Sequence, residues 1–542
     1  MADNFASYRQ HNYFMDEEFR SAALGNLEYA DRHAVEEKLD SNFTGSCFGI
    51  ALTSLLIYDG TIGIGELTEQ KADTVSAIQL EETIKSIINW YHVLQHTYEM
   101  QNVLVQFSKK TKEKEKINQL AEALKEGNPV LLAYYGKIND EPKIKGHAVI
   151  AYHIEPVNDF LGYDSNKKDL YKWRVDLYDC NMNEHNVMYL NTEQDNERWC
   201  IPSSRIYSNY RGSQATLGII TDNSAFLNHY GCVGSKDSAA ASEYFKKIVS
   251  YVQTEIHIPD CDSFSMNKID SEGDITIDYS EEEMIEIIPL FGEGDEEDII
   301  RYAMRDVNSG YSISTGKAKG YEMRIAMRYE DRLLEAECTN GSEASFMPDG
   351  KIALKMVGEC EYRIHMTSNS SCLNTDWYEF EVKGKSGDNI TVQPRENGWI
   401  LSGSSLENIS VKAKNEDSTV TGRFTTGYNS AYVYEIDKET IGIKADTDGD
   451  GIYETEITEE ELEKGDVTGD GNVSADDAQE VLEEYVAITL SGLKGKLTAA
   501  QRKAADINAD GIIGGDDAQN ILQYYVRTLS GEKITWEEIL RE

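Results

Sequence analysis

A cysteine near the start of the chain stands where a reactive thiol could form. Cys47 lies in the segment Gly45-Ser46-Cys47-Phe48, directly before an apolar run with helical spacing. The backbone N–H groups and the positive end of the helix dipole favour the thiolate at a helix start, and the thiolate is the nucleophilic form. The segment therefore predicts a cysteine placed for covalent chemistry, although a buried cysteine used only for packing fits the same pattern.

A thiolate that transfers acyl groups also needs a base, and a histidine follows in a suitable place. Residues 127–135 and 145–153 are apolar runs that predict two strands, and His147 begins the second. A third predicted strand ends at Asp179 and Asn181, whose side chains could orient an imidazole. Asp179 is the first choice and Asn181 the alternative, while His153 on the same strand is a second candidate base.

This order of motifs resembles the papain-like cysteine peptidases. Gly45-Ser46-Cys47-Phe48 resembles their nucleophile motif, Gly146-His147-Ala148 their histidine motif, and Leu177-Tyr178-Asp179-Cys180-Asn181 the third motif of bacterial branches. The resemblance implies an α+β fold in which Cys47 attacks a peptide carbonyl, His147 acts as base and then acid, and Asp179 fixes the imidazole tautomer. Such enzymes take an oxyanion donor from a glutamine six residues before the cysteine; Ser41 stands there, so Asn42 is the substitute candidate.

A second kind of chemistry is indicated by a repeat near the C-terminus. The segment that begins at Asp466 recurs from Asp506, 40 residues later. A twelve-residue calcium loop needs oxygen ligands at positions 1, 3, 5 and 12, a carbonyl at position 7 and glycine at position 6, and both copies comply. The predicted ligands are Asp466, Thr468, Asp470, Asn472, Ser474 and Asp477 in the first loop, and Asp506, Asn508, Asp510, Ile512 and Asp517 in the second.

Each loop is followed by one helix with an apolar face. Residues three, four, seven and eight apart lie on the same side of a helix, and two such faces are expected to pack as a pair. The faces consist of Ala478, Val481, Leu482, Tyr485 and Val486 in the first helix, and Ala518, Ile521, Leu522, Tyr525 and Val526 in the second.

The loop-helix, linker, loop-helix pattern of about residues 456–542 resembles the dockerin family. The resemblance implies two bound calcium ions and a cohesin domain of a cellulosome scaffold as partner. The positions that carry partner recognition in that family correspond to Ala475, Asp476, Gln479, Gly515, Asp516 and Gln519. A third acidic loop, with Asp446, Asp448 and Asp450, is a candidate calcium loop or an ordinary turn between strands.

Residues 257–455 show short alternating runs separated by Gly, Asn, Asp and Ser. Period-two alternation with frequent turn residues predicts one or two β-sandwiches. No catalytic constellation stands out there, so a spacer role is favoured over substrate or carbohydrate binding. Cys338, Cys360 and Cys372 could supply one disulfide.

The composition restricts the partners. Lys and Arg total 52 against 96 Asp and Glu, a formal charge of −44, which makes nucleic acid and anionic membranes improbable partners. No run approaches the roughly 18–20 apolar residues that span a bilayer, so membrane insertion is not expected. The first residues lack a basic patch before an apolar stretch, so no secretion signal is expected within this sequence.

The sequence thus predicts a multidomain protein with three parts. Residues 1–255 are expected to form the α+β papain-like domain, residues 256–455 an all-β sandwich-like region, and residues 456–542 an all-α, EF-hand-like dockerin. The expected function is a secreted, extracellular cysteine peptidase that acts on protein or peptide and is attached to a cell-surface scaffold through calcium-dependent cohesin binding. The alternatives are a transglutaminase-like acyltransferase, which shares the triad, and a catalytically inactive papain-like binding module.

Overall fold

The computed structural model covers all 542 residues. The residues that it describes are 16–25, 27, 29–40, 46–60, 63–64, 78, 81–108, 113–137, 144–161, 169–180, 186–193, 198–204, 206–207, 216–220, 250–270, 275–276, 284–286, 299–316, 319–330, 332–367, 377–385, 387–395, 398–403, 406, 408–414, 419–425, 428–437, 440–457, 462–469, 471–490, 497 and 499–541. The chain divides into two compact units, Met1–Glu255 with Tyr279–Val307 and Ile256–Asp278 with Asn308–Glu542.

Helices dominate the beginning of the first unit. They are α1 (Glu17–Gly25), α2 (Tyr29–Asp40), α3 (Cys47–Tyr58), α5 (Glu82–Val93), the short η3 (Leu94–His96), α6 (Tyr98–Ser108) and α7 (Glu113–Lys125). Helix α3 is buried along nearly its whole length, from Cys47 to Leu56, because its sequence is apolar on every side. A helix of this kind belongs in a core, so its first turn is held by packing on all sides.

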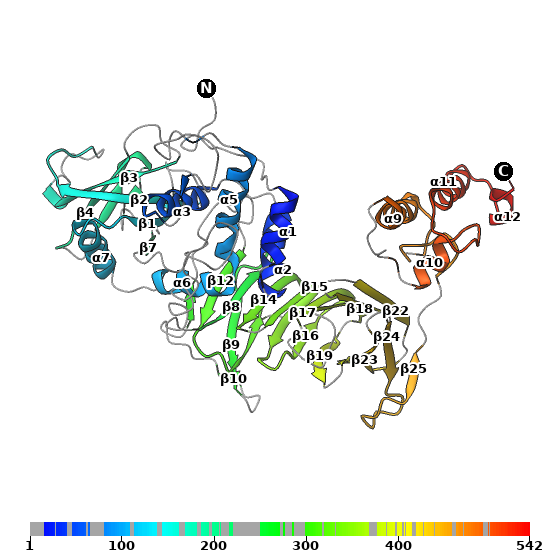
Figure 1. The fold of residues 1–542 in the computed structure, drawn as a ribbon. Coiled ribbons are helices and arrows are strands. Elements are labelled where there is room, and N and C mark those ends of the chain that lie inside the picture. The colour runs from blue at the N-terminus through cyan, green and yellow to red at the C-terminus, as the bar shows by residue number, and fades with distance from the viewer. Residues whose placement is uncertain are drawn as a thin grey trace. The chain divides into compact units, whose positions relative to one another are not determined.

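A seven-stranded antiparallel sheet follows these helices. The strands are β1 (Val130–Lys137), β2 (Ile144–Pro156), β3 (Trp173–Tyr178), β4 (Asn186–Leu190), β5 (Trp199–Ile201), β6 (Ile206–Tyr207) and β7 (Thr216–Ile220), with the short η5 (Pro202–Ser204) between β5 and β6. Their order across the sheet is β6-β5-β4-β3-β2-β1-β7 (Figure 1). The strands predicted around His147 and before Asp179 are therefore neighbours.

The sheet separates two hydrophobic cores. On one face, Leu131, Ala133, Ala148 and Ile150 pack with α3 and α5. On the other face, the alternate residues of β1 and β2 pack with α7. Because successive side chains of a strand point to opposite faces, the apolar runs that predicted β1 and β2 are explained by burial on both sides. This part is an α+β arrangement, as expected.

The remaining strands are short and numerous. Strands β11 (Met284–Glu286) and β12 (Ile299–Met304) belong to the first unit, and β8 (Val252–His257) spans the division between the units. The second unit contains β9 (Ser265–Ile269), β10 (Ile275–Thr276), β13 (Gly310–Ser314), β14 (Tyr321–Tyr329), β15 (Arg332–Phe346), β16 (Ile352–Met356), β17 (Cys360–Thr367), β18 (Trp377–Gly384), β19 (Asn389–Arg395), β20 (Gly398–Ser402), β21 (Asn408–Lys414), β22 (Thr419–Thr425), β23 (Ser430–Asp437), β24 (Thr440–Ala445) and β25 (Thr455–Ile457).

The fifteen-residue strand β15 organises this β region. Its first half pairs with β14 and β17, and its second half pairs with β13 and β16. The register with both β14 and β16 shifts at Gly341, where a bulge redirects the strand. The result is a large β-sheet region that includes a half-barrel, rather than one or two separate sandwiches as the sequence predicted.

The C-terminal part is helical. It contains α9 (Ala475–Tyr485), the π-helical turn η7 (Val486–Leu490), α10 (Ala499–Ala505), α11 (Gly515–Leu529) and α12 (Trp536–Ile539). The two helices pack as a pair, as predicted: Ala478 and Val481 share a core with Ala518 and Ile521. Four other residues of the predicted faces are exposed, namely Leu482, Val486, Leu522 and Val526.

No described helix is long and apolar enough to cross a membrane. Cys338, one of the three cysteines considered for a disulfide, is a free and buried thiol. The side chains of Cys360 and Cys372 lie outside the described residues.

Candidate functional site

The thiol of Cys47 lies at the first residue of α3, as predicted, and is 8% exposed. The preceding Ser46 does not cap the helix; its hydroxyl donates instead to the side-chain oxygen of Asn89 on α5, at 2.7 Å. Helix α5 also lies very close to the first turn of α3, because a Cβ added at Gly49 would be 2.0 Å from the carbonyl oxygen of Ile88. These contacts fix the position of the thiol.

His147 and Asp179 come together beside that thiol. Nε2 of His147 donates to Oδ1 of Asp179 at 2.7 Å, and both side chains are buried. Cys47 is a second side-chain hydrogen-bond partner of His147. The three residues singled out from the sequence therefore form one array.

Asn186 completes the support of the carboxylate and was missed by the sequence analysis. Its amide nitrogen donates to Oδ2 of Asp179 at 2.8 Å. Its own oxygen accepts from the Val187 N–H and from the hydroxyl of Ser203. No short motif marks Asn186, since it becomes a neighbour of Asp179 only when β4 pairs with β3.

The electrostatics of the array favour a charged imidazole. Burial lowers the pKa of His147, but its hydrogen bonds to Asp179 and Cys47, with the charges of these groups, outweigh burial and raise the pKa to about 10. At neutral pH the ring is an imidazolium between two acidic groups.

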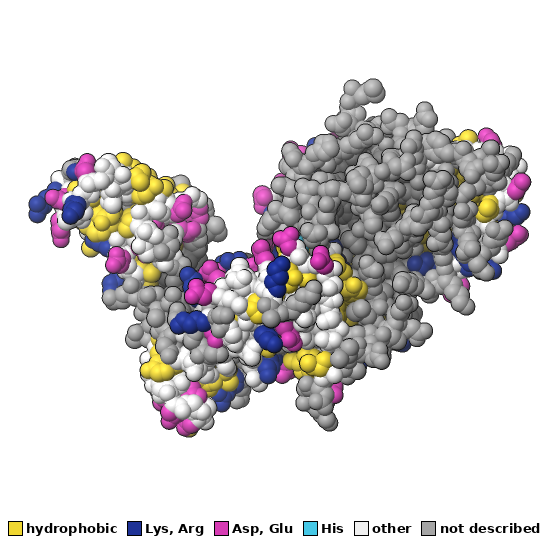
Figure 2. Space-filling model, turned by 180° about the vertical axis from the view of Figure 1, so that it is seen from behind, with side chains coloured by type: hydrophobic (Ala, Val, Ile, Leu, Met, Phe, Trp, Pro, Cys, Tyr) yellow, Lys and Arg dark blue, Asp and Glu magenta, His cyan; other side chains and the backbone are white. Residues whose placement is uncertain are grey.

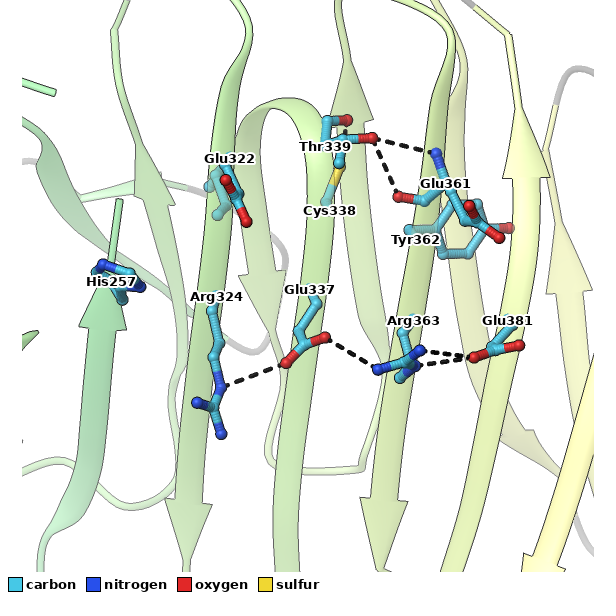
Figure 3. A pocket seen from close by; sticks show the side chains of 11 residues that line it. His257, Glu322, Arg324, Glu337, Cys338, Thr339, Glu361, Tyr362, Arg363 and Glu381 are labelled. Atoms are coloured by element: carbon cyan, nitrogen blue, oxygen red, sulfur yellow. Dashed lines mark hydrogen bonds and ion pairs between the residues drawn. The ribbon is translucent and has the colours of Figure 1, made fainter. Parts of the chain in front are cut away.

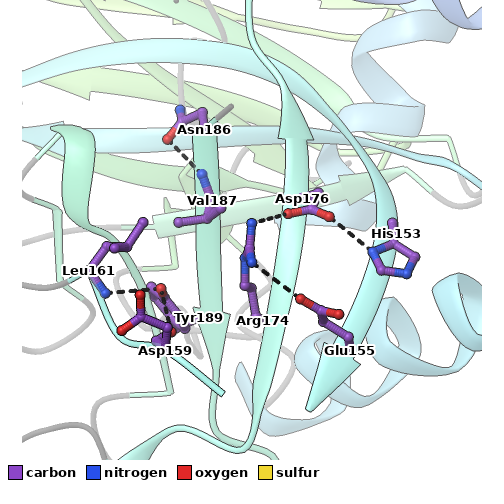
Figure 4. A network of polar contacts seen from close by, with 9 residues as sticks. All are labelled: His153, Glu155, Asp159, Leu161, Arg174, Asp176, Asn186, Val187 and Tyr189. Carbon is purple, nitrogen blue, oxygen red and sulfur yellow. Dashed lines mark hydrogen bonds and ion pairs between the residues drawn. The ribbon is translucent and has the colours of Figure 1, made fainter. Parts of the chain in front are cut away.

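His153, the second candidate base, belongs to a different network (Figure 4). A register shift between Ala151 and His153 carries it to the surface, where its side chain is 54% exposed and its Nδ1 lies 2.9 Å from Asp176. Asp176 also pairs with Arg174, which in turn contacts Glu155. In Figure 4 these side chains lie on neighbouring strands β2 and β3. Asn181 and Asn42 lie outside the described residues.

The two predicted calcium loops have the same internal bonding. In each, a carboxylate oxygen of the first residue accepts the N–H of the position-6 glycine: Asp466 from Gly471 at 3.0 Å, and Asp506 from Gly511 at 2.9 Å. These glycines have φ values of 85° and 81°, which other residues rarely adopt. The sharp turn points the early loop residues inward.

The last acid of each loop is fully buried. Asp477 accepts the N–H groups of Thr468 and Ser474, each at 2.7 Å. Asp517 accepts those of Ile507 and Gly514 in the same way. These bonds tie the end of each loop to its beginning. Of the remaining predicted ligands, Asn508, Asp510, Ile512, Asn472 and Ser474 lie in the described loops, and Asp470 lies outside the described residues.

The residues present fit calcium. Burial raises the pKa of the Asp517 carboxyl, so its ionised form is left incompletely stabilised by the loop. Among the described residues, the buried hydroxyl of Thr468 has no hydrogen-bond partner. A divalent cation among these oxygens would stabilise the ionised Asp517 carboxylate and give the Thr468 hydroxyl a partner.

The third acidic loop has a similar arrangement on the surface. The carboxylates of Asp446, Asp448 and Asp450 approach within 4.8 Å of one another, and Asp446 accepts the N–H of Gly451. The loop joins β24 to β25, the position expected of a turn between strands. Both interpretations made from the sequence are compatible with this geometry.

The family of type I dockerin domains matches residues 460–524. The C-terminal part of this chain is a type I dockerin domain. No curated protein matches the chain, and neither does any solved structure. Type I dockerins generally bind calcium, and a dockerin implies attachment to a cohesin domain of a cellulosome scaffold, outside the cell.

The surface of the dockerin has a polar and an apolar part. Of the predicted partner-recognition residues, all but the partly exposed Gly515 are exposed: Ala475, Asp476, Gln479, Asp516 and Gln519. Beside them lies an exposed apolar row made of Leu482, Val486, Leu522 and Val526. Figure 2 shows hydrophobic side chains gathered on this domain. The sequence analysis did not predict that this row is exposed, because it placed these residues on apolar helix faces that were expected to pack together.

A charged pocket of about 280 Å³ lies on the β region. Figure 3 shows its floor as a ladder of alternating charges on neighbouring strands. Arg324 pairs with Glu337, which also pairs with Arg363, which pairs with Glu381. Each charge in the ladder has a partner in a neighbouring strand, so the ladder stabilises strand pairing. Glu322 and Glu361 also line the pocket and add negative charge to it.

Proposed function

We propose that this protein is a cysteine peptidase delivered to its substrates by a scaffold-bound dockerin. The observation that carries the catalytic part is the buried array of Cys47, His147 and Asp179, in which the imidazole is hydrogen-bonded to both acidic partners. Cysteine, histidine and a carboxylate in this relation are the minimum for covalent acyl transfer by a thiol. The dockerin provides attachment, and the β region between them acts as a spacer.

In the proposed reaction each residue of the array has one step. The thiolate of Cys47 attacks the peptide carbonyl, and the imidazolium of His147 donates its proton to the leaving amine. The neutral imidazole then takes a proton from water, which attacks the thioester and releases the acid. Asp179, held by Asn186, keeps Nε2 protonated and the ring oriented throughout.

The start of α3 supplies the electrostatic support. A negatively charged oxygen formed at the substrate carbonyl would lie near the N–H groups of the first turn. The hydroxyl of Ser46 does not occupy them, because it is bonded to Asn89. The proposed oxyanion donors are therefore backbone N–H groups of this turn; the side-chain candidate Asn42 lies outside the described residues.

The test is cleavage of casein or a peptide library by the full chain. Activity lost in Cys47→Ala and kept in Cys200→Ala would support the proposal, since Cys200 is another buried cysteine that lies in a separate cluster. Both proteins should bind cohesin equally. No cleavage by the unmodified chain would contradict the peptidase assignment.

The runner-up is an acyltransferase, because the same array forms a thioester that an amine can resolve. Incorporation of a primary amine into a glutamine-containing substrate, without net cleavage, would favour it. If neither reaction occurs and an epoxide inhibitor fails to label Cys47, the domain is a binding module. The dockerin assignment is independent of all three outcomes.

A further inference from the structure

A buried tyrosine lies directly beside the imidazole of the candidate array. Tyr134 on β1 is paired with His147 on β2 in the register of the two strands, so both side chains lie on the same side of the sheet. Their ring centroids are 5.5 Å apart, and the ring planes are nearly perpendicular, at 84°. The mechanism proposed above gives Tyr134 no role.

Tyr134 is itself firmly held. It is 1% exposed and is one of the largest fully buried side chains among the described residues. It belongs to the hydrophobic core between the sheet and α7, and on its other side β1 pairs it with Leu217 of β7. A tyrosine side chain has only two rotatable torsions, so burial leaves this ring in a fixed position next to the imidazole.

The imidazole needs a neighbour that limits its rotation. The torsion that sets the plane of a histidine ring is broad and roughly two-fold, so strand β2 alone does not fix that plane. The hydrogen bonds to Asp179 and Cys47 form in the plane of the ring, where the nitrogens carry their protons and lone pairs. These bonds persist only while the ring keeps one orientation. The perpendicular ring of Tyr134 leaves little room for any other orientation.

We propose that Tyr134 is a positioning residue, which holds the ring of His147 in the orientation that binds Asp179 and Cys47. The proposal rests on the proposed function and adds a residue to it. Because Tyr134 is buried, it acts through the imidazole and not on the substrate. Perpendicular rings are a favoured arrangement of aromatic pairs. An aliphatic side chain at position 134 would lose this contact, whereas phenylalanine would keep it.

The experiment follows the protonation of His147 in the full chain. Carbon-13-labelled histidines are observed by NMR, and the His147 signal is identified by its loss in His147→Gln. In the parent we expect a pKa of about 10, because the hydrogen bonds and charges of Asp179 and Cys47 outweigh burial. In Tyr134→Leu the proton affinity of His147 should fall roughly three- to tenfold, because its in-plane bonds loosen. Tyr134→Phe should titrate as the parent does.

Tyr189→Leu is the matched control. Tyr189 is a fully buried tyrosine of the same sheet, and it belongs to a separate cluster in which its ring packs on Phe160. This variant should lose stability as Tyr134→Leu does, yet its His147 should titrate as in the parent. An unchanged pKa of His147 in Tyr134→Leu, or an equal fall in Tyr134→Phe or Tyr189→Leu, would overturn the proposal.

Circular dichroism checks the folding of each variant. If Tyr134→Leu is misfolded, Tyr134→Ile takes its place with the same expected fall, because isoleucine has the higher strand propensity. Peptide cleavage is measured separately, and the loss in the aliphatic variant is expected in kcat, by roughly tenfold, and not in KM. An inactive parent that shows the expected titrations refutes the peptidase and keeps the positioning role. An active parent with the same titration in every variant does the reverse.

Discussion

At the residue scale, the candidate site depends on how Asp179 is held. Asn186 donates to the carboxylate oxygen that His147 does not use. We expect Asn186→Ala to slow peptide cleavage roughly tenfold, the effect of about 1.4 kcal/mol on the barrier, because the imidazole loses its fixed orientation. The pH profile of Cys47 alkylation should shift as well, which loss of stability alone would not cause.

Asn191→Ala is the matched control. Asn191 is a buried amide just after the same strand, and its oxygen accepts the Glu193 N–H. It should lose stability without a change in the pH profile. Equal profiles for Asn186→Ala and the parent would contradict the positioning role.

The raised pKa of His147 makes stability depend on pH. The folded pKa is about 10 and the unfolded value about 6.5, so the folded state holds the proton more tightly. The stabilisation is complete below about pH 6.5 and is lost as the pH rises toward 10. The difference in melting temperature between the parent and His147→Gln should therefore shrink from pH 6 to pH 10. A constant difference would show that the imidazolium is not stabilised.

Two adjacent aspartates of the first calcium loop allow a matched comparison of variants. Asp477 is fully buried and ties the loop ends together, whereas its neighbour Asp476 is exposed. Asp477→Ala should abolish calcium binding by the first loop, because it removes the position-12 ligand. Asp476→Ala should retain it. Titration calorimetry of both variants gives the number of ions bound, and an unchanged number in Asp477→Ala would exclude the predicted ligand set.

The residues that sequence patterns could reveal are those inside short motifs. Cys47 was predicted from a helix start, His147 from a strand start and Asp179 from a strand end, and the structure brings the three together. Asn186 could not be assigned in the same way. Its contact with Asp179 depends on the pairing of β3 with β4 and not on a local motif.

At the element scale, the dockerin is closed by its last helix. The ring of Trp536 on α12 stacks on Tyr524 at 4.1 Å, and Gly465 lies against the same ring. A Cβ at Gly465 would be 2.3 Å from the ring, and the φ of this glycine is 89°. Gly465→Ala should therefore lower the dockerin's unfolding free energy by several kcal/mol, from strain and from displacement of the ring.

Gly531→Ala separates the cost of backbone strain from the cost of displacing the Trp536 ring. Gly531 has a similar φ of 87°, but nothing lies within 4 Å of its added Cβ. Only the backbone term, about 1 kcal/mol, is expected there. Calorimetry of the calcium-loaded chains measures both losses at the unfolding transition that shifts when calcium is removed. Similar losses in the two variants would mean that the helix does not close against Gly465.

In the β region the individual strands could be predicted from the sequence, but their arrangement could not. Period two identified strands such as β14, whose burial alternates from Met323 onward. The half-barrel could not be predicted, because it depends on β15 pairing with four different strands and on the register shift at Gly341. A glycine in a strand suggests a bulge but does not identify its partners.

At the scale of the whole molecule, attachment should depend on the exposed apolar row of the dockerin. Leu482, Val486, Leu522 and Val526 have the helical spacing of a core, yet the core is already filled by Ala478, Val481, Ala518 and Ile521. The row lies beside the polar positions predicted to recognise cohesin. An exposed apolar row rimmed by polar residues is typical of a protein interface.

We therefore expect Leu522→Asp and Val526→Asp each to weaken capture by a type I cohesin at least about tenfold, because a charge would be buried without a partner. Ile452→Asp is the control: Ile452 is 63% exposed but lies outside the dockerin helices. Surface plasmon resonance in calcium measures the affinity, and calorimetry checks that both calcium ions still bind. If the two dockerin variants still bind calcium and cohesin as the parent does, cohesin recognition depends on the polar residues at the helix starts and not on the apolar row. Cleavage by the N-terminal domain should be the same in all four proteins, because attachment supplies location and not chemistry.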